Sequence, residues 1–243
     1  PVCREETLMS GVLYGLGLGP GDPDLVTIKA ATILRHVPVI AYVTPMRANK
    51  STPSFARSIA APHFTDEKTE IPIPIVMRDD PAPGRRVYDE VSEEIAAHLE
   101  SGRDVAVLCE GDPLLYGSFM YVLERLKDAH TVLTVPGVSA LSAGAAAANL
   151  PLVTRHQSLA VIPATLGEDE IKTRLQVADG AAIFKVGRNI AKVKKILGEL
   201  GKMPRALYVE RASMTDGKVL PLSDAPDVAP YFSMILITDA ETD

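Results

Sequence analysis

The residues best suited to chemistry are two carboxylates, Glu110 and Asp112, in the run Glu110-Gly-Asp-Pro113. In a turn they would accept hydrogen bonds from hydroxyl or N–H donors more readily than they would act as an acid–base pair. The run follows Val105 to Leu108, an apolar stretch typical of a buried strand. Ligands of open α/β sheets lie at the carboxyl ends of strands, so this pattern favours a site. The same four residues also suit an ordinary type I or II turn, and local pattern alone leaves both interpretations open.

A second candidate is the glycine-rich loop that follows the apolar residues 12 to 14. It fails the dinucleotide fingerprint, because Gly15-x-Gly17-x-x-Pro20 lacks the third glycine and no acidic residue ends the expected strand at 39–43. It also lacks the Gly-Lys-Ser/Thr of a phosphate-binding loop, and Pro20 removes an N–H that a phosphate would need. The loop therefore favours close approach of the backbone to a bulky ligand that is not phosphate-like.

Other familiar catalytic patterns are absent from the sequence. Ser139 lies in Gly137-Val-Ser-Ala-Leu141, which is not the nucleophile motif Gly-x-Ser-x-Gly. The two cysteines, Cys3 and Cys109, form no Cys-x-x-Cys, and no His-Glu-x-x-His occurs among the five histidines. We therefore assign no catalytic residue and expect no metal site. Backbone-rich turns at strand ends suit an enzyme that works by binding and positioning its substrates.

The elements that would position these turns alternate between short apolar strands and helices, which predicts an α/β protein with a mostly parallel first sheet. Residues 88–100 show helical spacing of apolar side chains, and 71–75 can form only an edge strand because it contains Pro72 and Pro74. In the second half, 218–238 holds two expected strands with no helix between them, so the second sheet should be mixed. We predict two α/β domains, 1–130 and 131–243.

Composition narrows the function further. The 243 residues are 47% hydrophobic and 23% charged, and the net charge of −6 argues against nucleic-acid binding. No apolar run is long enough to span a membrane, and residues 1–8 lack the apolar core of a signal peptide. We therefore expect a soluble, cytoplasmic protein. The chain begins at Pro1, and Met9 is a candidate for the native start.

One stretch departs from the acidic average. From Leu25 to Thr65 there is no Asp or Glu, and five cations occur: Lys29, Arg35, Arg47, Lys50 and Arg57. A locally basic stretch on an acidic protein favours an anionic small ligand. Alternatively, some of these cations cap helix C-termini or face solvent.

Four motifs in order along the chain resemble those of the tetrapyrrole methylase family, the class III S-adenosylmethionine-dependent methyltransferases. They are Gly17-Leu-Gly-Pro-Gly-Asp-Pro23, Leu25-Val-Thr-x-Lys-Ala30, Glu110-Gly-Asp-Pro113 and Val135-Pro-Gly-Val-Ser-Ala140. Residues 114–121 and 230–237 resemble the branch of the family that methylates C20 of precorrin-2. Methylases of uroporphyrinogen usually carry Gly-Gly-Asp-Pro, so Glu110 also fits the C20 branch.

The resemblance implies two α/β domains with the active site in the cleft between them, S-adenosylmethionine as methyl donor, and a homodimer. It implies a donor site built mostly from backbone. The positions carried over onto this chain are Pro20, Glu110, Gly111, Asp112, Leu115, Ser139, Ala140, Val186 and Ala212. The role of Glu110 stays open.

The implied substrate, precorrin-2, carries many carboxylates, which suit Arg and Lys partners. Arg47, Lys50 and Arg57 are our candidates for them, and Tyr116 and Tyr121 are candidates for the substrate trough unless they pack in the core. One alternative is the cobalt-factor II C20-methyltransferase of the anaerobic route, because no residue set distinguishes the metallated substrate. Another, from a different class, is a non-catalytic regulator that binds S-adenosylmethionine or a nucleotide.

Overall fold

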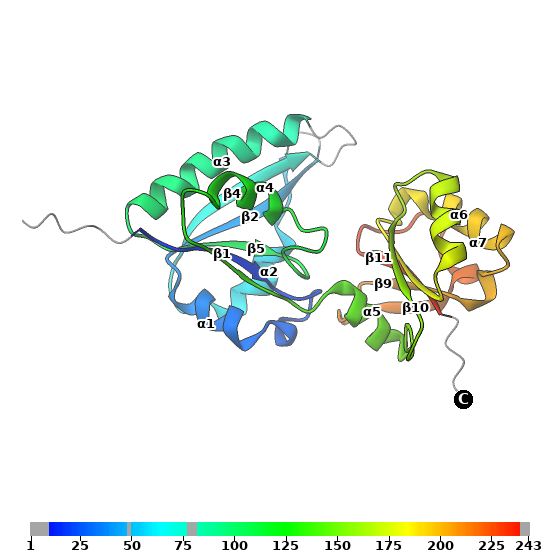
Figure 1. Cartoon of the computed structure of the whole chain (residues 1–243). Helices are drawn as coiled ribbons and strands as arrows, with labels where there is room; N and C mark the ends of the chain where they lie inside the picture. Colours follow the sequence, from blue (N-terminus) through cyan, green and yellow to red (C-terminus); the bar gives the residue numbers. More distant parts are fainter. Residues whose placement is uncertain (1–9, 48–49, 77–81, 239–243) are drawn as a thin grey trace, which may run out of the picture. The chain divides into compact units, whose positions relative to one another are not determined.

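The computed structural model describes residues 10–47, 50–76 and 82–238, and of Arg47, Lys50, Ala82 and Pro83 it describes the backbone only. The candidate start Met9 lies outside the described residues. The chain divides into two compact units, Pro1–Ser139 and Ala140–Asp243. Each unit is a sheet covered by helices on both faces (Figure 1). This confirms the predicted α/β class.

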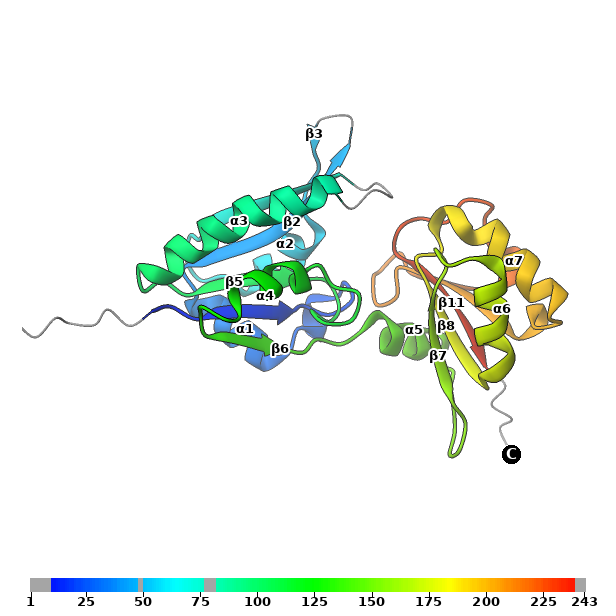
Figure 2. The same ribbon diagram turned by 45° about the horizontal axis from the view of Figure 1, so that its top comes forward.

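The first sheet has the strand order β4-β2-β5-β1-β6, and all these neighbours are parallel. A short β3 pairs antiparallel with the end of β2. Figure 2 shows this two-stranded extension projecting beyond the rest of the sheet. The strands are β1 (Leu13–Gly17), β2 (Val39–Arg47), β3 (Lys50–Ser51), β4 (Thr69–Val76), β5 (Val105–Cys109) and β6 (Val132–Val135).

Helices α1 (Ile28–His36) and α2 (Phe55–Ala60) pack on one face of this sheet through a core that contains Leu34 and Ile59. Helices α3 (Ala82–Glu100) and α4 (Phe119–Leu126) pack on the other face. The alternating apolar residues of β5 and its neighbours serve both cores, which is why β5 is buried along its whole length.

Strand β4 lies at the edge of the sheet, as its prolines predicted, because a proline cannot donate to a second neighbour. Strand β6 pairs with β1 and so belongs to the first unit. The division between the units consequently falls after Ser139, later than the predicted 130/131. The sequence placed residues 131–139 in the second domain because nothing in the strand itself says which sheet it joins.

The second sheet has the order β10-β9-β11-β8-β7 and is mixed, as predicted: β7 and β8 are parallel, and β11 is antiparallel to both β8 and β9. Helices α6 (Glu168–Val177) and α7 (Ile190–Glu199) cover one face, and α5 (Ala140–Ala148) covers the other. The strands are β7 (Leu159–Pro163), β8 (Gly180–Phe184), β9 (Ala206–Glu210), β10 (Lys218–Pro221) and β11 (Ser233–Thr238).

Candidate functional site

The carboxyl ends of β1 and β5 form the topological switch point of the first sheet. The two strands are parallel neighbours, with Gly17 opposite Cys109. The chain leaves β1 towards α1 on one face and leaves β5 towards α4 on the opposite face. Open α/β sheets bind ligands in the crevice that such divergence creates. The run Glu110-Gly-Asp-Pro113 and the glycine-rich loop after β1 therefore lie side by side at the expected place.

Glycine lets three loops meet at this edge. Gly19 and Gly111 form an isolated antiparallel bridge, with N···O distances of 3.3 Å and 2.7 Å. A Cβ on Gly137, in the loop after β6, would lie 2.1 Å from the carbonyl oxygen of Gly111, and one on Gly17 would lie 2.4 Å from the Gly137 nitrogen. Both distances are below any real contact, so the loops can converge only because these residues lack side chains. Gly17 and Gly19 make these contacts, and the Gly-x-Gly-x-Gly spacing was their signal in the sequence.

Asp112 fastens the turn to the loop after β6. Its Oδ2 accepts a hydrogen bond from the Gly137 N–H at 3.1 Å, and its Oδ1 accepts one from the Leu114 N–H at 2.9 Å. Carboxylate-to-amide bonds are among the stronger protein hydrogen bonds. Asp112 thus holds the shape of the edge, in addition to any contact with a ligand.

Glu110 reaches in another direction, towards the start of α2. Its Oε1 accepts a hydrogen bond from the Ala56 N–H at 3.2 Å. The residue keeps exposed surface, yet protein atoms crowd its carboxylate; this desolvation raises the pKa of Glu110, and the amide bonds partly oppose the rise. No sequence pattern indicated this partner, because 54 residues separate Glu110 from Ala56.

Large apolar side chains are exposed immediately after the turn. Leu114 is 58% exposed, Leu115 40% and Tyr116 45%. Met120 and Tyr121, in the first turn of α4, are exposed as well. Tyr116 adopts a left-handed backbone (φ 57°), which bulky residues rarely do. Soluble proteins seldom leave so many large apolar groups together in water unless they bind something.

The candidate positions of the second unit lie in loops after β8 and β9. Since both strands are antiparallel to β11, these loops emerge at the same edge of the second sheet. Val186 is fully buried and Ala212 is 8% exposed, so neither residue presents much surface to a ligand in this structure. Their neighbours Lys185 (φ 56°) and Arg211 (φ 49°) are left-handed without being glycine. Such strain gathers at ligand-binding positions.

The other predicted positions lie at the start of α5 and in the β2–β3 extension. Ser139 and Ala140 are half-buried where the chain enters α5. Arg47 and Lys50 pair through their backbones in the β2–β3 extension, and their side chains lie outside what the structure describes.

Arg57 has a carboxylate partner that the sequence did not predict. Its Nε and Nη2 donate to the two oxygens of Glu70 at 2.8 Å and 2.6 Å, and the Tyr42 hydroxyl donates to Glu70 as well. The hydrogen bonds from Arg57 are the main reason that the pKa of Glu70 is lowered. A substrate carboxylate at Arg57 would therefore compete with Glu70. Glu70 is in β4, outside the acid-free stretch, which is why the sequence suggested an unopposed cation.

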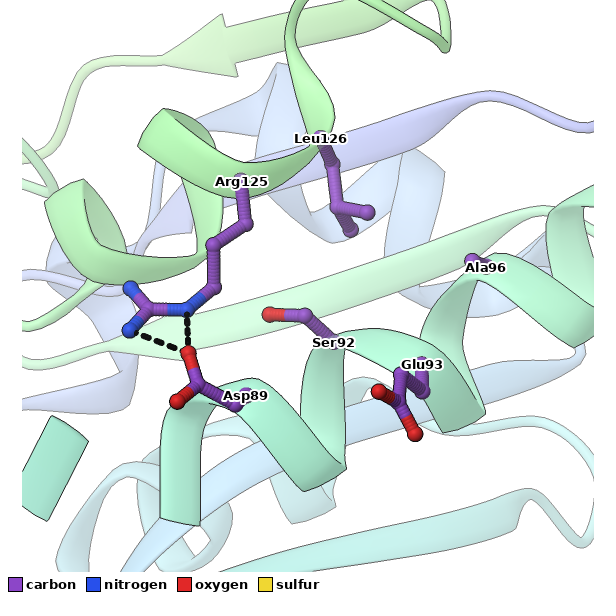
Figure 3. Close-up of a pocket in the computed structure, with 6 residues that line it drawn as sticks. All are labelled: Asp89, Ser92, Glu93, Ala96, Arg125 and Leu126. Atoms are coloured by element: carbon purple, nitrogen blue, oxygen red, sulfur yellow. Dashed lines mark hydrogen bonds and ion pairs between the residues drawn. The ribbon is translucent and has the colours of Figure 1, made fainter. Parts of the chain in front are cut away.

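A separate groove of about 350 Å³ lies between α3 and α4. Figure 3 shows its lining, in which Arg125 Nε donates to Asp89 Oδ1 at 2.7 Å. Because Asp89 is in α3 and Arg125 is in α4, this bond joins the two helices; a second bond, from Arg125 to the Tyr121 carbonyl at 2.7 Å, lies within α4. The groove lies against the helices and not at the carboxyl edge, and we interpret it as a structural junction.

Within the described ranges, no group of three or more His, Cys, Asp or Glu side chains is arranged to hold a metal ion. The helices of the described part of the chain are each too short or too polar to cross a bilayer.

Comparison with known proteins places these features in context. The model of the tetrapyrrole (corrin/porphyrin) methylases matches residues 12–226. The chain is 38% identical to a precorrin-2 C(20)-methyltransferase from Sinorhizobium sp and 35% identical to a cobalt-precorrin-2 C(20)-methyltransferase from Salmonella typhimurium. Each match covers 94% of this chain and 97% of the relative.

The chain is also 40% identical, over 93% of its length, to the cobalamin biosynthesis protein CobIJ of Mycobacterium tuberculosis, and it spans only 46% of that longer relative. Among solved structures, a uroporphyrin-III C-methyl transferase from Thermus thermophilus complexed with S-adenyl homocysteine is similar in fold, with a TM-score of 0.68 and 24% identity. That match covers 94% of this chain and 98% of the other.

Proposed function

The chain belongs to the tetrapyrrole methylase family, and from that premise we propose that it transfers a methyl group from S-adenosylmethionine to C20 of precorrin-2, giving precorrin-3A in cobalamin biosynthesis. The observation that carries the proposal is the match to a precorrin-2 C(20)-methyltransferase over nearly the whole of both chains. The chain spans only 46% of the CobIJ relative, so the proposal concerns the activity of these 243 residues and not that of the longer protein.

The edge of the first sheet fits a methyl donor better than it fits a nucleotide. S-adenosylmethionine, when bound, supplies an electrophilic methyl group on a positively charged sulfur. The edge presents two carboxylates, Glu110 and Asp112, beside closely packed glycine backbone, and it lacks a Lys-bearing phosphate loop. Negative charge beside a sulfonium is favourable, whereas it would oppose a phosphate.

We propose that the donor contacts the backbone and side chains identified from the family resemblance. In the first unit these are Pro20, Glu110, Gly111, Asp112, Leu115 and Ser139. In the second unit they are Ala140, Val186 and Ala212, and the left-handed residues beside the last two support backbone contacts there.

The chemistry needs no strong protein nucleophile. C20 of the reduced tetrapyrrole is enamine-like and already nucleophilic; it forms one C–C bond to the methyl carbon as the S–C bond breaks, and C20 then loses one proton. The chain therefore has to align the reactants and exclude water. The exposed apolar side chains of Leu114, Leu115 and Tyr116 suit the flat face of a macrocycle.

We propose that Arg47, Lys50 and Arg57 bind the substrate carboxylates. The acid-free stretch supports this for the first two, and Arg57 would have to exchange Glu70 for the substrate. The double variant Arg47→Ala/Lys50→Ala should raise the KM for precorrin-2 while leaving the Kd of S-adenosylhomocysteine unchanged. An unchanged KM would remove both residues from the site.

A second candidate function is methylation of the cobalt-containing substrate, and it is favoured by the relative from Salmonella at 35% identity. Turnover of purified protein with precorrin-2, with and without cobalt in the macrocycle, separates the two. Activity on the cobalt form alone would overturn our first choice.

A non-catalytic regulator is the rival from another class. It predicts binding of S-adenosylhomocysteine in calorimetry without methylation of any tetrapyrrole, whereas our proposal predicts a product one methyl group heavier by mass spectrometry. We also propose that the protein is a cytoplasmic homodimer. Light scattering coupled to gel filtration tests the dimer, and a monomeric mass would exclude it.

A further inference from the structure

The segment 225–232, which we call the β11 entry loop, lies between the two loops of the second unit that hold left-handed residues. On one side, a Cβ on Gly187 would lie 4.0 Å from the Ala229 carbonyl oxygen. On the other side, the Arg211 N–H donates to the Phe232 carbonyl at 2.8 Å. The β11 entry loop therefore belongs to the same edge of the second sheet as the loops after β8 and β9.

The β11 entry loop is fixed at both of its ends. The Lys194 Nζ of α7 donates to the Ala225 carbonyl at 2.6 Å, and the Ser233 hydroxyl donates to the Pro230 carbonyl. Ala225 and Ala229 are buried in the core that α6 and α7 share with the sheet. A loop held in this way presents its other side chains in a defined geometry, so a ligand would not have to order it on binding.

Two large apolar side chains of this fixed loop are exposed. Val228 is 76% exposed and Tyr231 is 68% exposed. In the described part of the second unit the other large apolar side chain in this state is Val177, at the end of α6, so two of the three gather here. The Tyr231 ring meets Phe232 edge-on, with ring centroids 5.0 Å apart. A tyrosine held by its loop and open to solvent is well suited to anchor a ligand.

Exposed cations lie in the adjoining loop. Lys185 and Arg188 follow β8, and both are exposed. Nearby, Arg211 forms an ion pair with Asp216, and Asp227 is the acidic residue of the β11 entry loop itself. An aromatic ring beside exposed cations, on a protein with a net charge of −6, suits a flat apolar ligand that carries carboxylates at its rim.

We propose that Val228, Tyr231, Lys185 and Arg188 form a subsite for the tetrapyrrole, in which the Tyr231 ring lies against the macrocycle and the two cations bind peripheral carboxylates. This rests on the proposed function, because it takes the substrate from it. The segment 230–237, which resembles the C20 branch, would then have a role in binding: the Ser233 hydroxyl holds the loop, and Tyr231 meets the substrate. None of these side chains acts on the reacting carbon.

The test measures the Kd of precorrin-2 by anaerobic absorbance titration with S-adenosylhomocysteine present, so that no turnover is needed. Tyr231→Ala should raise this Kd about tenfold, as for loss of an aromatic anchor, and Tyr231→Phe, which keeps the ring, should stay within about threefold of wild type. Neither variant should change the Kd of S-adenosylhomocysteine in calorimetry. The matched control is Val177→Ala, an exposed apolar residue away from this edge, which should change neither Kd.

Arg188→Gln tests the carboxylate half of the subsite. It should raise the Kd of precorrin-2 about threefold at low salt, and the difference from wild type should shrink as ionic strength rises, because salt screens exposed charges. A Kd equal to that of wild type at low salt would remove Arg188 from the subsite.

Two results would overturn the subsite as a whole. One is a Tyr231→Ala protein that binds precorrin-2 as tightly as Val177→Ala does. The other is a Tyr231→Ala protein with half the mass of wild type in light scattering, since the surface would then join two copies of the chain.

Failure of the subsite and failure of the proposed function are distinguishable. If wild type methylates precorrin-2 and Tyr231→Ala does so with an unchanged KM, the subsite fails and the proposed function stands. If wild type binds precorrin-2 with the expected dependence on Tyr231 but forms no methylated product, the proposed function fails and the subsite stands.

Discussion

In the first unit, the loops at the carboxyl edge of the sheet pack closely because they contain glycine. In the second unit, the loops after β8 and β9 contain a lysine and an arginine in left-handed conformations. Gly17 and Gly137 pack against each other and against the Gly111 carbonyl, with no space for a Cβ on either. Lys185 and Arg211 hold left-handed conformations that glycine would adopt without strain. At the first edge the space between backbones limits which residues fit, and at the second edge the backbone conformation does. Replacing glycine should therefore destabilise the first edge, whereas introducing glycine should not destabilise the second.

The largest effect is expected from Gly137→Ala. The new Cβ would lie 2.1 Å from the Gly111 carbonyl oxygen, and this overlap can be relieved only by moving the backbone of one of the two loops. We expect a loss of about 2–4 kcal/mol in the free energy of unfolding, and weaker binding of S-adenosylhomocysteine in calorimetry. Gly198→Ala in α7 is the matched control, since its Cβ meets nothing within 4 Å, and it should be neutral or stabilising by up to about 1 kcal/mol. Equal stability of the two variants would show that the glycine contacts do not limit the first edge.

The next effect is expected from Asp112→Ala. The change leaves the Gly137 and Leu114 amides without their carboxylate partner. Chemical denaturation should show a loss of about 1–3 kcal/mol. Asp112→Asn keeps the oxygen that accepts from one amide and should lose less. If Asn and Ala cost the same, the carboxylate charge, rather than the hydrogen bonds, holds the edge.

The second edge should respond to glycine in the opposite sense. Lys185→Gly relieves a left-handed conformation and should leave the free energy of unfolding unchanged or raise it by up to about 1 kcal/mol. The measurement is thermal unfolding beside Ala191→Gly, a substitution at an exposed position of helix α7 that should destabilise the protein by about 1 kcal/mol. A destabilised Lys185→Gly would mean that the side chain, and not the backbone shape, is what the loop needs.

The smallest effect concerns pH. Because the folded-state pKa of Glu110 is raised, its ionised form destabilises the folded protein at neutral pH, and this contribution disappears as the pH falls through the folded pKa to below the unfolded value. Glu110→Gln should therefore have a melting temperature equal to or above that of wild type at pH 7.5, with the difference shrinking towards pH 4. A difference that grows on acidification would have the wrong sign.

The two edges also differ in what the sequence could predict. Spacing of glycine and proline, read with the apolar run before Glu110, identified the first edge and placed it after a buried strand. The sequence did not predict the left-handed conformations of Lys185 and Arg211, because residues of these types are usually right-handed or extended and no motif marks the exceptions. Apolar spacing over 25–37 favours a helix with Asp24 as its cap, but α1 begins at Ile28, and Thr27 Oγ1 accepts the Ala30 N–H. Asp22 instead caps a short 3₁₀ helix, Pro23–Leu25, which keeps these residues out of α1.

The sequence also did not predict polar contacts between residues that are far apart along the chain. The acid-free stretch suggested an unopposed Arg57, yet the parallel pairing of β2 and β4 brings Glu70 beside α2. The same holds for Glu110, whose acceptor role depends on α2. Periodicity predicts which face of an element is buried, but contacts between polar side chains of different elements depend on strand order, which the sequence did not specify.

Anaerobic incubation of the purified protein with precorrin-2 and S-adenosylmethionine, labelled with ¹³C in its methyl group, tests directly whether this chain methylates C20 of precorrin-2. We expect a product that carries one added methyl group, with a single labelled carbon bonded to C20 in the carbon NMR spectrum. A labelled methyl at any other carbon, or no transfer although S-adenosylhomocysteine binds, would contradict it.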